Sequence, residues 1–189
     1  MDALLHQLQG KAEGVARTDI TVQKDDLRTL LHDVAAERLA ILQRHEASAR
    51  VVGHYDFNNA YQYVINREET HLTWLQNALA EFDASMPGPA SAVQAPTAPK
   101  AGKTPEASAY RGILNEDAAA LAAFVSRWRP RVEGMTHARH RTMLNVVIGE
   151  SLEHQRLFEQ ASAGFEDVLG RRTTGAERVG AVLPSRWQE

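Results

Sequence analysis

Four long segments of this chain repeat apolar residues every three or four positions, and this periodicity limits the folds available to it. The segments cover about residues 25–53, 57–82, 105–128 and 136–169. Such spacing places the apolar side chains on one face of an α-helix. No segment alternates apolar and polar residues in the way that indicates a β-strand. We therefore predict an all-α fold, and hydrophobic residues, at 43% of 189, are numerous enough for the core of one domain.

A proline-rich stretch lies between the second and third segments. Residues 83–105 contain five of the seven prolines, among alanine, serine, glycine and threonine. An extended chain of this length, at about 3 Å per residue, can run the whole length of a helix bundle. Because the other two connections are short, we predict two αα-hairpins joined by a long crossover linker, with the four-helix bundle at 25–169. Residues 1–24 then form an N-terminal segment and 170–189 a polar C-terminal tail.

Glycine and proline indicate where the helices end. Pro130 and Gly134 are expected to end the third helix, and Gly170 the fourth. Gly10 and Gly14 weaken the helical pattern of the N-terminal segment, so at most a short helix is expected there.

Charge and composition exclude several functional classes. Lysine and arginine number 21 against 24 aspartate and glutamate, so no basic excess is available to neutralise nucleic-acid phosphates. The absence of cysteine excludes disulfides, thiolate zinc sites and cysteine-bound iron–sulfur clusters. No stretch approaches the roughly 20 apolar residues of a membrane span, and the first residues lack a secretory-signal pattern. The expected location is therefore cytoplasmic.

Ionisable residues lie on the expected apolar faces of the helices. On a helical wheel, carboxylates and histidines fall among the leucines and valines that should form the core, at one level of the bundle. The first helix supplies Glu37, the second Glu68 and His71, the third Asp117 with Glu116 at its flank, and the fourth Glu150 and His154.

Burying four carboxylates requires compensation, because each costs several kcal/mol unless it is paired or ligates a metal. The helical wheel places no cation at the centres of these faces, whereas Arg67, Arg111 and Arg156 lie at their edges. Two divalent ions would balance four carboxylates, and two imidazoles would complete their coordination. Carboxylate and imidazole ligands without thiolate favour iron or manganese over structural zinc.

This set of motifs resembles the ferritin-like di-iron carboxylate superfamily, in particular rubrerythrin and bacterioferritin. The resemblance covers about residues 25–169 and includes the Glu-x-x-His motif of Glu68 and His71. On the fourth helix, Glu150 and His154 are spaced by four residues instead of three, which still leaves them on one face.

The resemblance implies a ferritin-like four-helix bundle holding two iron ions, with manganese as the alternative metal. Glu68 and Glu150 would bridge the ions, and His71 and His154 would each bind one. The remaining implied ligands are Glu37, Asp117 or Glu116, and, as a further carboxylate, Glu153.

The implied activity is that of an oxidoreductase that oxidises Fe(II) while reducing O2 or peroxide. Tyr61 and Tyr110 lie seven residues from Glu68 and Asp117 and could be second-shell neighbours of the metals, although core packing is the simpler interpretation. From its spacing along the first helix, His45 is interpreted as a core or bundle-end residue. The pair His137 and His140 is interpreted as a solvated first turn of the fourth helix, because it lies about 20 Å from His154 along the helix axis.

Two alternative functions remain open from the sequence. One is a metal-free four-helix interaction or structural protein, and the other is an iron-storage subunit of a large assembly. A second apolar face on the second and fourth helices, which includes Trp74 and Leu152, also predicts a homodimer.

Overall fold

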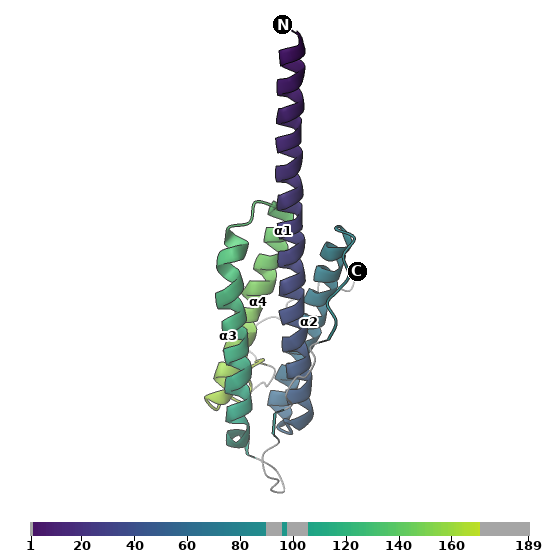
Figure 1. Ribbon diagram of the computed structural model, residues 1–189. Coiled ribbons are helices and arrows are strands. Elements are labelled where there is room, and N and C mark those ends of the chain that lie inside the picture. Colours follow the sequence, from purple (N-terminus) through teal and green to yellow (C-terminus); the bar gives the residue numbers. More distant parts are fainter. Residues whose placement is uncertain (1, 90–95, 98–105, 171–189) are drawn as a thin grey trace, which may run out of the picture.

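The computed structural model describes residues 2–89, 96–97 and 106–170, with the backbone alone for residues 2–23. These ranges form four α-helices and one short 3-10 helix, with no β-strand among them, so the predicted all-α class is confirmed (Figure 1). Most of the linker at 83–105 and of the tail at 170–189 lies outside the described residues. The elements are α1 (Asp2–Val51), α2 (Tyr55–Ala80), η1 (Ala107–Tyr110), α3 (Arg111–Glu133) and α4 (Ala138–Ser162).

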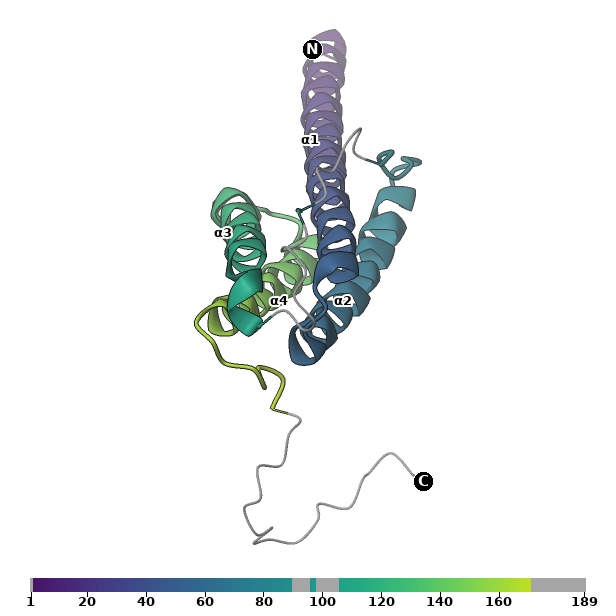
Figure 2. The same ribbon diagram turned by 90° about the horizontal axis from the view of Figure 1, so that it is seen from below.

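The helices pack as two hairpins, α1 with α2 and α3 with α4, and the hairpins meet through α1 against α3 and α2 against α4 (Figures 1 and 2). The hydroxyl of Tyr110 accepts a hydrogen bond of 3.0 Å from the backbone N–H of Gly53, which joins the end of α1 to the start of α3. At the opposite end, Arg139 at the start of α4 pairs with Glu81 after α2 at 2.9 Å. The chain therefore leaves α2 at one end of the bundle and begins α3 at the other.

The first helix is much longer than expected. It begins at Asp2 instead of near residue 25, and its first half extends past the other three helices (Figure 1). The physical reason is that Gly10 and Gly14 reduce helix stability by about 1 kcal/mol each relative to alanine but do not break a helix. No proline stands in this stretch.

Two predicted helix ends were wrong. Pro130 lies inside the last turn of α3, which continues to Glu133, and Gly134 alone marks the end. The fourth helix stops at Ser162, eight residues before Gly170, because Gly164 adopts a left-handed φ of 102° and turns the chain. Phe165, which the periodicity assigned to the apolar face of this helix, lies beyond the turn and is exposed.

An apolar core runs through the bundle between the four helices. Its fully buried members come from every helix and include Leu31, Phe57, Leu121 and Phe158. No helix in the described part of the chain is both long and apolar enough to cross a membrane. This core is interrupted at one level by buried ionisable side chains, and that level holds the candidate site.

Candidate functional site

Five ionisable side chains, here called the buried polar layer, are fully enclosed in the middle of the bundle. Each has 0% of its surface exposed. Helical spacing brings them together, because residues three, four or seven apart share one face of a helix. The layer consists of Arg38 and His45 from α1, Glu68 and His71 from α2, and His154 from α4.

Glu68 is the acceptor at the centre of this layer. Nδ1 of His45 lies 3.0 and 2.9 Å from its two carboxylate oxygens. Nη2 of Arg38 lies 3.3 Å from the same carboxylate. Burial opposes ionisation, but the interactions with His45 and Arg38 outweigh it and lower the pKa of Glu68. Glu68 is therefore an anion held between a histidine and an arginine.

Arg38 overturns the expectation that no cation lies at the centre of these faces. Its side chain is fully buried and lies over the ring of Phe124, with Cζ 5.3 Å from the ring centroid. The reason is the register of α1: Val34, Arg38 and Ile41 are spaced by four and three residues, so Arg38 is in phase with the core. Glu37, one residue away, is rotated by about 100° to the edge of the face.

His71 connects the layer to the surface. Nη2 of Arg38 lies 3.1 Å from Nδ1 of His71, and because arginine only donates, Nδ1 must accept. The ring proton is then on Nε2, which donates to Glu150 at 2.8 Å. Glu150 is half-buried and also accepts two hydrogen bonds from Arg67, at 2.9 and 2.5 Å. An ion pair between Glu68 and Arg38, followed by hydrogen bonds through His71 and Glu150, thus connects the layer to the bundle surface.

Two histidines of the layer are held in the neutral form. Burial, followed by the charge of Arg38, lowers the pKa of His71 to about 4. The same two causes, in the same order, lower the pKa of His154 to about 3. At neutral pH both rings are therefore uncharged, which is the form that binds a metal ion, although the lone pair of His71 is occupied by the hydrogen bond from Arg38.

His154 has no hydrogen-bond partner at either ring nitrogen, although both are buried. Its ring stacks on His71 with centroids 6.3 Å apart, and the edge of Tyr63 packs on it at 5.9 Å. Unpartnered buried atoms also occur at Nε2 of His45 and at Nε and Nη1 of Arg38. A buried polar atom without a partner costs about 1–3 kcal/mol, so this layer is costly as it stands.

Two of the expected carboxylates pair with groups outside the layer. Glu37 accepts from Trp128 at 2.8 Å and from Arg127 at 3.0 Å. Glu116 is mainly exposed and pairs with Arg44 at 2.9 Å. The structure therefore does not gather the four carboxylates that the sequence placed at one level. Glu68, His71 and His154 belong to the layer, and Glu150 reaches it through His71, whereas Glu37 and Glu116 pair with groups of α3 and α1.

Asp117 is buried, as its place on the third helix predicted, but its two oxygens already have partners. The hydroxyl of Tyr61 donates to it at 2.5 Å, and Nε of Arg44 pairs with its other oxygen. Burial and then Asp117 raise the pKa of Tyr61, so this phenol keeps its proton. Glu153 is exposed, and Tyr110 is a buried link between helix ends.

Of the other histidine predictions, the one for His45 is confirmed and the one for His140 is wrong. His45 is indeed a core residue, and the sequence did not reveal its contact with Glu68. His140 is buried instead of solvated, and its Nδ1 lies 2.7 Å from Nδ1 of the exposed His137. The signal available for Arg38 and His45 was their common register, since seven residues separate them along the core face of α1.

The layer is not arranged as a ready-made metal site. Among the described residues, one group brings three ligand atoms within 4.8 Å of one another: His54, Asp56 and Glu166, at the end of the bundle. This group is partly exposed, and Asp56 and Glu166 have other interactions. Ions at the layer would therefore require its side chains to move closer together.

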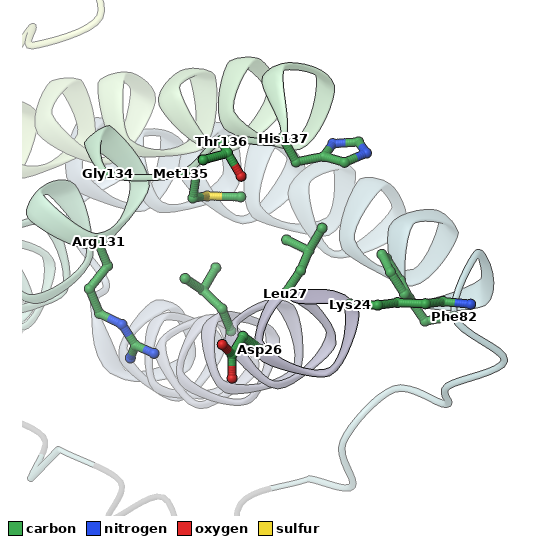
Figure 3. A pocket seen from close by; sticks show the side chains of 10 residues that line it. Lys24, Asp26, Leu27, Phe82, Arg131, Gly134, Met135, Thr136 and His137 are labelled. Atoms are coloured by element: carbon green, nitrogen blue, oxygen red, sulfur yellow. The ribbon is translucent and has the colours of Figure 1, made fainter. Parts of the chain in front are cut away.

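A cavity at one end of the bundle is separate from the layer. It has a volume of about 530 Å³ and lies where α1 passes the end of α3 and the start of α4 (Figure 3). Leu27 and Met135 contribute apolar surface, and Lys24 and Arg131 contribute charge at its edge. None of the five layer residues lines it.

Comparison with known proteins adds no assignment to this geometry. The chain matches no known protein family, no curated protein and no solved structure.

Proposed function

We propose that this chain is a metal-binding four-helix protein of the ferritin-like type, and that His71, Glu150 and His154 hold a divalent transition-metal ion between α2 and α4. The observation that carries this proposal is His154, a neutral and fully buried imidazole whose two nitrogens have no partner. The resemblance in the sequence and the opposite-end connection of α2 and α3 both agree with a ferritin-like bundle.

The donor set suits iron. Two imidazoles and one carboxylate form the ligand set typical of non-haem Fe(II) proteins that react with O2, with coordination positions left for the oxidant. When bound, such an ion supplies electrons for the reduction of O2 or peroxide. We therefore propose an oxidoreductase that uses Fe(II), with manganese as the alternative metal.

A single ion agrees better with the charges of the layer than the two ions of the sequence-based hypothesis. Glu37 and Asp117 are paired with groups of other helices, and Arg38 already balances Glu68. The four-carboxylate set of a di-iron centre thus does not fit these contacts. Glu150 is the remaining carboxylate, and it accepts a hydrogen bond from His71.

Four side chains have defined tasks in this proposal. For Nε2 of His71 to bind the ion, the ring proton must move from Nε2 to Nδ1, because a neutral imidazole keeps one N–H. Nδ1 then no longer accepts from Arg38, which keeps its ion pair with Glu68. Arg67 holds Glu150 at the bundle surface, and His154 must move toward both ligands.

Metal content tests the proposal directly. Protein produced with added iron and manganese should retain about one ion per chain, measured by ICP-MS, as expected for a mononuclear site. Glu150→Gln should lose the ion, whereas the control Glu116→Gln, at an exposed carboxylate on α3, should keep it. An equal and low metal content in all three proteins would refute the site. Oxygen consumption by the Fe(II)-loaded protein then tests the reaction.

A metal-free interaction protein is the second candidate, and one observation favours it. Arg38 and Arg67 neutralise Glu68 and Glu150 without any metal ion. This candidate predicts a melting temperature that is the same in EDTA and in excess Mn²⁺. Metal binding predicts a higher melting temperature with the ion, since a ligand that binds the folded state stabilises it.

Assembly remains a prediction from the sequence. Size-exclusion chromatography with light scattering distinguishes a homodimer from the large assembly that iron storage requires. A monomer at tens of micromolar would refute both.

A further inference from the structure

We infer that Arg38 is a built-in cation that occupies the place of a second metal ion beside Glu68 and so limits this bundle to a single ion. The inference rests on the proposed metal site, and its test separates the two ideas. It assigns Arg38 a role in metal stoichiometry that a merely structural ion pair would not have.

The contacts of Arg38 are those of a cation among metal ligands. A single atom, Nη2, lies 3.3 Å from a carboxylate oxygen of Glu68 and 3.1 Å from Nδ1 of His71. Carboxylate oxygen and imidazole nitrogen are also the donors that iron and manganese prefer. The guanidinium thus stands between two groups that would otherwise be available to an ion.

The rest of the guanidinium gains little from its position. Nε and Nη1 are buried without hydrogen-bond partners, and the group packs on Phe124. An arginine placed only to make ion pairs would use its planar fork for two parallel hydrogen bonds to one carboxylate. Arg67 does this with Glu150, at 2.9 and 2.5 Å, whereas Arg38 contacts Glu68 through Nη2 alone.

Removing the charge of Arg38 leaves Glu68 as a buried anion with His45 as its neighbour. An uncompensated buried carboxylate must take up a proton or attract another cation. Nδ1 of His45 already faces Glu68 at 2.9 Å, so a carboxylate and an imidazole nitrogen are adjacent there. The vacated space beside Glu68 then supplies the volume for a second ion.

The experiment measures metal stoichiometry in Arg38→Met, which keeps the apolar stem of the side chain and removes the guanidinium head beside Glu68. Co²⁺ is the probe, titrated by calorimetry and counted by ICP-MS after dialysis. We expect about one ion per chain in the wild type and about two in the variant, the number found in two-metal sites. The double variant Arg38→Met with Glu68→Gln should return to the wild-type count, because the buried anion is gone.

The test includes a control variant and a replacement variant. Arg127→Met removes an exposed arginine of α3 and should leave the count unchanged. Arg38→Gln, whose amide can still donate to Glu68, is the replacement if Arg38→Met does not fold, which far-ultraviolet circular dichroism reports. Both Arg38 variants are expected to gain the second ion.

Each outcome decides one of the two ideas. One ion in the wild type and one in a folded Arg38 variant would overturn the role of Arg38 while leaving the metal site intact. No ion in the wild type but an ion in the Arg38 variant would refute the proposed function and support the role of Arg38 as the resident cation. No ion in either protein would refute both.

Discussion

The pairing of Glu68 with Arg38 makes a strong prediction about stability. In Glu68→Ala, the carboxylate is removed and the fully buried guanidinium of Arg38 loses the only acidic group that it contacts among the described residues. Nδ1 of His45 loses its acceptor at the same time. The perturbation therefore leaves one charge and one ring nitrogen buried without a partner.

The free energy of unfolding is expected to fall by about 3–5 kcal/mol, because removing one partner of a buried ion pair leaves the other charge buried without compensation. Proteins of this size have total stabilities of about 5–15 kcal/mol. Each kcal/mol lowers the melting temperature by about 2–4 °C for a domain of 150–250 residues. Glu68→Ala should therefore melt roughly 10 °C below the wild type.

The assay is urea unfolding followed by circular dichroism in EDTA, so that no metal contributes to either protein. Glu116→Ala is the matched control, because Glu116 also pairs with an arginine but its side chain is 68% exposed. Exposed pairs contribute about 0–1 kcal/mol. The double variant Arg38→Met with Glu68→Leu should recover most of the loss, since an apolar pair of similar volume often replaces a buried ion pair without cost. A loss in Glu68→Ala no larger than in Glu116→Ala would refute the buried pair.

Three further predictions address other parts of the site. His154→Leu should raise the stability of the metal-free protein by about 1–2 kcal/mol in urea unfolding, because it removes two buried unpartnered nitrogens, and it should abolish metal retention; a destabilised variant would contradict this. The metal-free protein should lose stability as the pH falls from about 6.5 toward 4. In this range the histidines of the unfolded chain bind protons, whereas His71 and His154, with folded pKa values of about 4 and about 3, stay neutral. A free energy of unfolding that does not change over this range would contradict the prediction. Tyr61→Phe should cost about 1–2 kcal/mol by removing the donor to Asp117, measured in the same urea assay with Tyr55→Phe, at an exposed tyrosine, as the control.

The sequence predicted the helices well because their signal is local. Apolar spacing within each segment is enough to recognise a helix, whatever it packs against. The helix ends depend on particular backbone conformations. Gly164 and Gly170 both have positive φ, at 102° and 62°, and only the first ends α4. Periodicity alone could not choose between these two glycines.

Spacing within one helix was enough to place Glu68 and His71 on α2, and His154 on α4, toward the core, and the structure buries all three. Their role as metal ligands stays a prediction. Asp117 was correctly placed in the core by its position among apolar residues. Its partners come from two other helices, since Arg44 reaches it from α1 and Tyr61 from α2. Such long-range pairs are set by how the helices pack, and one helix alone does not reveal them.

The sequence analysis did not place Arg38 in the core, because arginine is almost always solvated and Glu37 was taken as the inward residue. The spacing between Arg38 and His45 indicates the correct face. Val34, Arg38, Ile41 and His45 follow one another at steps of four, three and four residues, the step pattern of a core face. A buried arginine becomes plausible only when its acceptor, Glu68, is known to face it.

The layer is a cost to the fold that a bound ion can offset. Five of its nitrogens are buried without partners, on Arg38, His45 and His154, at about 1–3 kcal/mol each, a sum comparable to the whole stability of a domain. Well-packed apolar residues at these positions would give a more stable bundle. A group that partners His154 recovers part of this free energy and raises the melting temperature in proportion to its binding. Stability and binding therefore oppose each other at this position: the substitution that most stabilises the empty bundle is the one that removes its proposed ligand.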